Sequence, residues 1–147
     1  LREVTLPALR RGRSCAGRDL AGFTITGLPF VATGRTDDEL AEAARAVRSR
    51  LAFYASTPAY RGVLELHGWA ELGGELHGLS RRGRWAEMGE RVPDEVLDAV
   101  AVIGRPAEAG AELARRYGDV FSRIAVDAPY PLEPEVEDEL AAAVRAD

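Results

Sequence analysis

The sequence predicts an α/β protein that is mostly helical and contains a small parallel sheet. Residues 23–33 and 121–126 are nearly continuous in apolar, β-branched and aromatic side chains, a composition typical of strands buried on both faces. The segments around them carry apolar residues at helical spacing. Strands that alternate with helices indicate βαβ units, which place the strands parallel in one sheet.

The first two elements are a helix and a strand. Residues 1–13 are expected to form the tail of a helix with a kink at Pro7. A polar stretch then leads into the strand at 23–33. Gly27 and Pro29 predict a bulge in that strand, because glycine has no side chain to pack and proline cannot donate a ladder hydrogen bond.

A helix start at Thr36 is the clearest local signal. Thr36-Asp-Asp-Glu39 is a capping box, in which the threonine hydroxyl and the glutamate carboxylate each accept a backbone N–H of the first turn. Apolar residues then recur at helical spacing as far as Tyr54. We therefore predict a helix over about 37–54.

Four shorter helices are expected after this long one. Their ranges are about 58–68, 70–82, 84–91 and 93–102. The first should open with Thr57 as its N-cap and Pro58 at its first helical position. Residues 36–104 are thus expected to be a helical block without a strand.

A helix, a strand and a final helix are predicted for the remainder. Gly104-Arg-Pro106 begins a helix that should end at Gly118, and the strand at 121–126 follows. Pro134 opens the last helix, whose acidic first turn suits the helix dipole. Since a stable sheet normally needs three or more strands, the two predicted strands imply that others are supplied from elsewhere.

The composition argues against several classes of protein. The net charge is −5 and all 19 basic residues are arginine, which suggests the codon bias of a GC-rich genome more than a surface for nucleic acid. No apolar run approaches the ~18 residues that span a bilayer. The single Cys15 cannot form an internal disulfide, so we expect a reducing, cytoplasmic setting.

Several motifs together resemble a deazaflavin-dependent subgroup of the luciferase-like oxidoreductases. Leu51-Ala-Phe-Tyr-Ala-Ser-Thr-Pro-Ala-Tyr60, followed by Leu64-Glu-Leu-His-Gly-Trp69, resembles the segment after the seventh strand of that subgroup. Further similar segments are Phe30-Val-Ala-Thr-Gly34, Trp85-Ala-Glu-Met88, Val102-Ile-Gly-Arg-Pro106 and Arg115-Arg-Tyr-Gly-Asp119. The resemblance covers essentially the whole chain. Arg105 departs from it, since the family usually has a threonine or serine there to cap the following helix.

The resemblance implies the C-terminal part of a (β/α)8 barrel of the TIM type, a fold of about 250 residues. Residues 1–147 would form one partial domain with the last two barrel strands and a helical insertion, and 36–104 would be the long helix with that insertion. The start at Leu1, with Met88 as the only methionine, agrees with a missing front segment. The implied partners are the missing N-terminal half, or a second copy of the chain, and a small-molecule substrate.

Candidate binding residues follow from the same resemblance, because a barrel places its site at the carboxyl ends of its strands. They are Thr33 and Gly34 for the coenzyme, and Ser56, Tyr60, Asp127 and Tyr130 for the substrate. The implied coenzyme is the deazaflavin coenzyme F-420, with FMN as the alternative. No catalytic residue can be assigned.

Structural interpretations compete with some of these assignments. Asp127 is able to cap a turn before Pro129. Tyr54 is equally interpreted as the last core residue of its helix, and Thr57 as a helix cap without a binding role. The two Glu-Leu-His-Gly repeats predict no metal site, because neither a cysteine nor a third histidine accompanies them. The two Arg-Arg-Gly-Arg repeats, at 10–13 and 81–84, suit helix ends better than the phosphorylated tail of a coenzyme.

The sequence therefore predicts part of an enzyme that moves a hydride between a deazaflavin and an unknown organic substrate. Two alternatives stay open. One is flavin-dependent monooxygenation on the same fold, because one barrel hosts many chemistries. The other is a non-catalytic helical interaction module built from residues 36–104. The 147-residue chain by itself is expected to be inactive.

Overall fold

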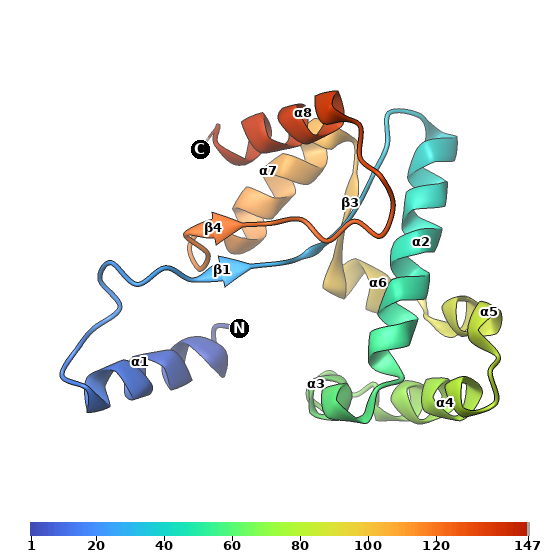
Figure 1. Cartoon of the computed structure of the whole chain (residues 1–147), viewed down its shortest axis with the longest axis horizontal. Coiled ribbons are helices and arrows are strands. Elements are labelled where there is room, and N and C mark those ends of the chain that lie inside the picture. The colour runs from blue at the N-terminus through green and yellow to red at the C-terminus, as the bar shows by residue number, and fades with distance from the viewer. Residues whose placement is uncertain (147) are drawn as a thin grey trace.

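The computed structural model describes residues 1–146 (Figure 1). Short strands run through the centre and helices lie on either side of them. In chain order the elements are α1 (Thr5–Cys15), β1 (Thr26–Gly27), β2 (Phe30–Thr33), α2 (Asp37–Ala55), a 3-10 turn (Pro58–Tyr60), α3 (Arg61–Leu66), α4 (Ala70–Arg81), α5 (Trp85–Met88), a second 3-10 turn (Gly89–Arg91), α6 (Asp94–Val100), β3 (Ala101–Gly104), α7 (Pro106–Tyr117), β4 (Arg123–Ile124) and α8 (Pro134–Val144).

The strands form a small parallel sheet around residues 26–33. β2 pairs with β3 in the register Phe30 to Ala101, and β1 pairs with β4. Beyond β4 the pairing continues on the same edge, where the Asp127 N–H donates to the Pro29 carbonyl (2.9 Å) and the Val31 N–H donates to the Asp127 carbonyl (3.1 Å). Residues 26–33 are thus the central strand, with β3 on one edge and 123–127 on the other.

Helices cover both faces of this sheet. Val31 and Val102 point to one face, where they pack with Ala109 and Leu113 of α7 and with Leu140 of α8. The neighbouring residues in each strand point to the opposite face, which is covered by α2, α4 and α6. From β2 the chain crosses to β3 on one edge of the sheet, and from β3 it crosses to β4 on the opposite edge. Because such crossovers are right-handed, the two steps place their helices on opposite faces.

The two strands predicted from the sequence are neighbours in this sheet. β1 pairs with β4, as consecutive strands of a barrel do, and β3 adds an unpredicted strand on the other edge of the central strand. Residues 1–146 alone form an open sheet with helices on both faces. The prediction of an α/β class with parallel strands is confirmed, and the barrel arrangement is not seen in the described residues.

Two expected strands are changed in the structure. The strand expected over 23–33 divides at Leu28 and Pro29 into β1 and β2, at the interruption that Gly27 and Pro29 predicted. The strand expected over 121–126 is reduced to β4.

The absence of a strand from 36–104 was a wrong prediction. The helix expected to reach Val102 ends at Val100, and Ala101–Gly104 form β3. Pairing with β2 satisfies the backbone groups of this segment, and its two β-branched residues, Val102 and Ile103, favour a strand over another helical turn.

The remaining helices agree closely with the prediction, α1 excepted. α2 begins at the capping box of Thr36, α4 ends before Gly83, which has a φ of 70°, and α8 begins at Pro134. α1 begins at Thr5 and ends at Cys15, later than expected at both ends. Pro7 lies in its first turn, where a missing N–H removes no intrahelical hydrogen bond, so proline is tolerated there without a kink. No helix in residues 1–146 is long and apolar enough to cross a bilayer.

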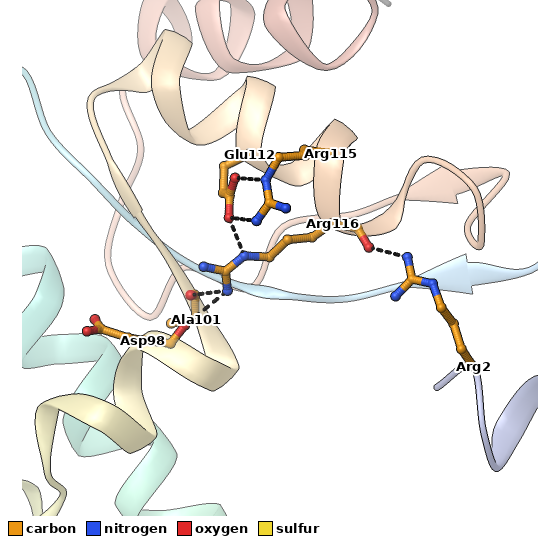
Figure 2. A network of polar contacts seen from close by, with 6 residues as sticks. All are labelled: Arg2, Asp98, Ala101, Glu112, Arg115 and Arg116. Carbon is orange, nitrogen blue, oxygen red and sulfur yellow. Dashed lines mark hydrogen bonds and ion pairs between the residues drawn. The ribbon is translucent and has the colours of Figure 1, made fainter.

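An arginine network fastens α7 to the end of α6 (Figure 2). The Glu112 carboxylate accepts hydrogen bonds from Arg115 and Arg116, each at 2.6 Å. The Arg116 guanidinium also donates to the carbonyls of Asp98 (3.0 Å) and Ala101 (2.9 Å), which satisfies groups at the end of α6 and the start of β3. At the far side, Arg2 donates to the Arg116 carbonyl at 2.8 Å and so attaches α1 to α7.

Candidate functional site

The six candidate residues fall in three separate cavities. Thr33, Gly34 and Tyr130 line one at the carboxyl ends of the strands. Tyr60 and Asp127 line a second beside the amino end of β2, and Ser56 lines a small third one. Because α2 runs back from the carboxyl end of β2 toward its amino end, the junction after α2 lies far from Thr33. The expectation that this junction shares a site with the strand exits is not met in the described residues.

The carboxyl-edge cavity has a volume of about 410 Å³ and lies between α2 and the loop that leads to α8. From β2 the chain turns to α2 on one face, and from 123–127 it turns to α8 on the other face. The cavity is therefore at the point where the direction of the connections reverses. Ligands of open α/β sheets bind in the crevice at such a switch point, outside the carboxyl ends of the strands.

Thr33 carries an unpartnered polar atom in the wall of this cavity, below the exposed surface. The residue is 3 % exposed, and its hydroxyl oxygen is the one buried side-chain polar atom in residues 1–146 without a hydrogen-bond partner. A buried hydroxyl without a partner costs roughly 1–3 kcal/mol, which a ligand atom at hydrogen-bond distance would recover. Thr33 is therefore a better binding candidate in the structure than its sequence position alone indicated.

Gly34 allows the start of α2 to lie against the end of β2. A Cβ at Gly34 would be 2.7 Å from both the Glu39 Cβ and the Leu40 amide nitrogen, so a larger residue would force the helix away. The capping box closes the same turn: the Glu39 amide donates to the Thr36 hydroxyl at 3.2 Å, and the Glu39 carboxylate accepts the amides of Arg35 and Thr36.

Arg105 positions the first turns of α2 and α7, a role that the sequence did not predict. An arginine side chain cannot accept an amide hydrogen bond, so α7 keeps only half of a capping box, in which the Glu108 carboxylate accepts the Arg105 amide at 3.1 Å. The guanidinium instead donates to Asp37 (2.5 Å) and to the Gly34 carbonyl (3.4 Å). It thereby ties the first turns of α7 and α2 together at the carboxyl edge.

Tyr130 uses its hydroxyl within the fold. It accepts the Thr33 amide at 2.8 Å and lies 3.1 Å from the Val31 carbonyl, to which it donates. Burial raises the pKa of the Tyr130 phenol, and the hydrogen bond from the Thr33 backbone offsets part of that rise. The side chain therefore forms a wall of the cavity and closes the edge of β2, while its expected contact with substrate stays a prediction.

The second cavity, of about 320 Å³, is apolar and aromatic. Tyr54 packs between Phe30 and Tyr60, with ring centroids 5.8 and 5.5 Å away. His67 stacks on Trp69 at 4.6 Å, and Asp127 lies in the same wall. Sequence reasoning gave His67 and Trp69 no functional role, because only the folded chain brings the turn that holds them to the same cavity as Tyr54 and Asp127.

Ser56 is committed to a local structural role. Its hydroxyl donates to the Phe53 carbonyl at 2.7 Å, and its own carbonyl accepts a hydrogen bond from Nδ1 of His77 at 3.0 Å. Thr57 was expected to cap the turn that follows. Its hydroxyl instead donates to the same Phe53 carbonyl at 3.3 Å. No group of three potential metal ligands gathers in the described residues.

The fold is an α/β sheet with a cavity at the carboxyl ends of its parallel strands. The comparisons are more specific. The model of the family "Luciferase-like monooxygenase" matches residues 2–123, so the chain belongs to the luciferase-like monooxygenase family. The matched range includes Thr33 and Gly34 and ends before Asp127 and Tyr130.

Curated relatives come from mycobacteria. "Uncharacterized protein Rv1360" of Mycobacterium tuberculosis and "Uncharacterized protein Mb1395" of Mycobacterium bovis are each 48% identical over 124 residues. That alignment covers 84% of this chain and 36% of each relative. The chain thus spans about a third of the length of the relatives that it matches.

Family members use a flavin or a deazaflavin coenzyme, which sets a test for the cavity. Its volume and its unpartnered Thr33 hydroxyl suit the edge of a planar ring that carries polar atoms. Its charge does not suit a phosphate, because the charged residues that line it are Glu39, Glu42 and Glu133. The described residues fit the ring of such a coenzyme and do not fit its phosphorylated tail.

Proposed function

We propose that this chain forms one wall of the active site of a luciferase-like oxidoreductase that transfers a hydride between a deazaflavin coenzyme and an organic substrate. Family membership supports the oxidoreductase class. The observation that carries the assignment of the site is the buried, unpartnered Thr33 hydroxyl in the cavity at the switch point. When bound, the coenzyme supplies the redox chemistry, and the protein supplies orientation and electrostatics.

Each residue of the wall has a separate task in this proposal. Thr33 exchanges a hydrogen bond with a polar atom of the ring, and Gly34 leaves the backbone free of a side chain beside it. Tyr130 holds the end of β2 through the Thr33 amide and excludes water from that edge. Arg105 fixes the two helix starts around the cavity through Asp37 and Gly34.

The complete enzyme needs more chain than residues 1–147. The relatives are nearly three times as long as the aligned segment, and we infer that the additional residues supply the other strands of a (β/α)8 barrel together with the phosphate contacts. Such strands would add at the outer edge of 123–127, because an unpaired strand edge is a template for further pairing, and would take the place of β3 beside β2. A second copy of this chain is the alternative partner, at the outer edges of β3 and of 123–127.

A flavin-dependent monooxygenase is the second candidate function. The matched family carries the monooxygenase name, which favours it. The segment from Leu51 to Tyr60 favours the deazaflavin subgroup, because it resembles that branch. A titration with both coenzymes distinguishes them.

The experiment titrates a deazaflavin and FMN, each followed by its own fluorescence, into the 147-residue chain and into a chain extended at its N-terminus to the length of the relatives. We expect micromolar binding of the deazaflavin by the extended chain alone, weaker binding of FMN, and a loss of about 10-fold in affinity for Thr33→Val, a typical effect of one hydrogen bond. Micromolar binding by the 147-residue chain alone would contradict the proposal that other strands complete the site. An unchanged affinity of Thr33→Val in the extended chain would contradict the role of Thr33.

A further inference from the structure

We propose that the aromatic cavity at the amino end of β2 is a second binding site, and that it takes an amphiphilic amine, an organic cation attached to an aromatic or aliphatic body. The cavity has a volume of about 320 Å³ and is separated from the carboxyl-edge cavity by the length of β2. This proposal does not rest on the proposed oxidoreductase function, and it concerns the end of the sheet opposite to the coenzyme.

The walls of this cavity present ring faces and ring edges from three parts of the chain. Tyr54 and Tyr60 meet edge to face at 89°, and Phe30 packs against Tyr54 at 49°. His67 and Trp69 form a stacked pair, with 14° between their planes, in the turn between α3 and α4. Ring faces attract a cation within about 6 Å of the centroid, most strongly for tryptophan and tyrosine.

Asp127 adds a single negative charge to these apolar walls. Its backbone N–H and carbonyl are both used in pairing with the central strand, so the residue is held in place. Its carboxylate has neither a hydrogen bond nor an ion pair in residues 1–146, although nine arginines of the chain are paired with carboxylates elsewhere. No arginine lines the cavity. A fixed carboxylate beside apolar walls attracts a cation more strongly than one in water does, because the local dielectric is lower.

The same features argue against other ligand classes. An anion would meet the Asp127 carboxylate and no arginine. A sugar would find few polar partners, since most of the lining residues are apolar, among them Leu51, Val63 and Leu64. A neutral apolar molecule fits the walls but gains nothing from Asp127. An amine on an apolar body uses the rings, the aliphatic side chains and the carboxylate together.

Trp69 provides the readout, because it lines the cavity and Trp85, the other tryptophan of the chain, does not. In a Trp85→Phe variant, the fluorescence of Trp69 is followed while 2-phenylethylamine, 2-phenylethanol or phenylacetate is added. The three probes have similar apolar bodies and carry a positive, a zero and a negative charge. We expect the amine to bind about 10-fold more tightly than the alcohol, a ratio typical of a partly desolvated cation among rings, and phenylacetate to bind most weakly.

Two further variants assign the preference to this cavity. Asp127→Asn should reduce the affinity for the amine to that for the alcohol and leave the affinity for the alcohol unchanged. Glu133→Gln, in the carboxyl-edge cavity, is the matched control and should change neither. Three results would each overturn the proposal. The first is equal binding of the amine and the alcohol, and the second is no binding of the amine at concentrations up to about 10 mM. The third is a preference for the amine that survives Asp127→Asn. Loss of amine binding in the N-terminally extended chain would overturn it as well, since it would show that the chain itself covers the cavity.

Discussion

Thr33 is the residue at which stability and binding make opposite demands. Its hydroxyl is buried without a partner, which costs free energy in the unliganded chain. We expect Thr33→Val, which keeps the shape and removes the hydroxyl, to raise the free energy of unfolding by about 1 kcal/mol in urea denaturation. Thr26→Val, at the exposed position of β1, is the control and should change it by less than about 0.5 kcal/mol. A destabilised Thr33→Val would mean that the hydroxyl has a partner in the folded chain.

Glu112 gives the chain a pH-dependent contribution to stability. Hydrogen bonds from Arg115 and Arg116 lower the pKa of this carboxyl from 4.5 to about 2. A lowered pKa in the folded state stabilises the fold above the unfolded pKa, and that contribution is lost as the pH falls from about 4.5 to about 2. We expect Glu112→Gln to cost about 1 kcal/mol at pH 7, a value at the upper end for partly exposed ion pairs, and much less at pH 2, where about half of the carboxyl is protonated.

The measurement is urea denaturation of both proteins at pH 7, 4 and 2. The control is Glu65→Gln, which removes one exposed pair with Arg61 at 3.4 Å and should cost less than about 0.5 kcal/mol at pH 7. If the loss for Glu112→Gln were the same at pH 2 and pH 7, it would arise from packing and not from the charge.

The sequence was informative for site residues whose place depends on one element. Thr33 and Gly34 were assigned because they follow a strand, and the structure puts both in a cavity at its exit. Ser56 and Tyr130 were less predictable, because their hydroxyls are satisfied by backbone groups that only the folded chain brings near. For Tyr130 that group is the Thr33 amide, 97 residues earlier in the chain.

At the scale of elements, the start of α2 was predicted from sequence because its signal is local. The Thr36 hydroxyl accepts the Glu39 amide as the capping box requires. We expect Thr36→Ala to lower the free energy of unfolding by about 1 kcal/mol, the usual cost of losing an N-cap. Thr57→Ala is the matched control, since the Thr57 hydroxyl makes no cap, and it should have a smaller effect in thermal denaturation. Equal effects would show that the cap contributes nothing specific.

The contact between α7 and α8 depends on Gly110. A Cβ at this position would be 2.5 Å from the Leu140 carbonyl oxygen and 2.6 Å from the Ala143 Cβ, so α8 must move away from α7. We expect Gly110→Ala to destabilise the chain by about 1–3 kcal/mol, as overpacking does. Gly74→Ala in α4, where a Cβ meets nothing within 4 Å, should instead stabilise by up to about 1 kcal/mol through helix propensity. Denaturation curves that shift in the same direction would contradict this packing.

β3 was missed because its signal is not local. Four residues, Ala101–Gly104, follow α6 directly without a turn, and their apolar character continues that of the helix. A short apolar run is ambiguous between helix and strand when only periodicity is considered. What decides is the backbone pairing with β2, about 70 residues earlier in the chain.

At the scale of the whole molecule, the sequence predicted two parallel strands and could not predict the third strand beside them. In a barrel the last two strands are neighbours, as β1 and β4 are in this structure. The strand before them would occupy the edge of β2 that β3 occupies here. The pairing of β3 with β2 should therefore depend on whether the rest of the barrel is present.

A disulfide between paired strands tests this dependence. Phe30 and Ala101 are opposite each other in the parallel register of β2 and β3. Neighbouring strands are about 4.8 Å apart, within the Cα separation that a disulfide spans. In a Cys15→Ser background, we expect Phe30→Cys with Ala101→Cys to crosslink on mild oxidation of the 147-residue chain, detected as faster migration in a non-reducing gel.

In the N-terminally extended chain this crosslink should be lost, because the preceding barrel strand would take the edge of β2 that β3 occupies. Thr26→Cys with Arg123→Cys is the control and should crosslink in both proteins, since consecutive barrel strands are neighbours, as β1 and β4 are in this structure. A missing Phe30–Ala101 crosslink in the short chain would show that its sheet has a different order. An equal yield of this crosslink in both chains would exclude the barrel as the architecture of the longer protein.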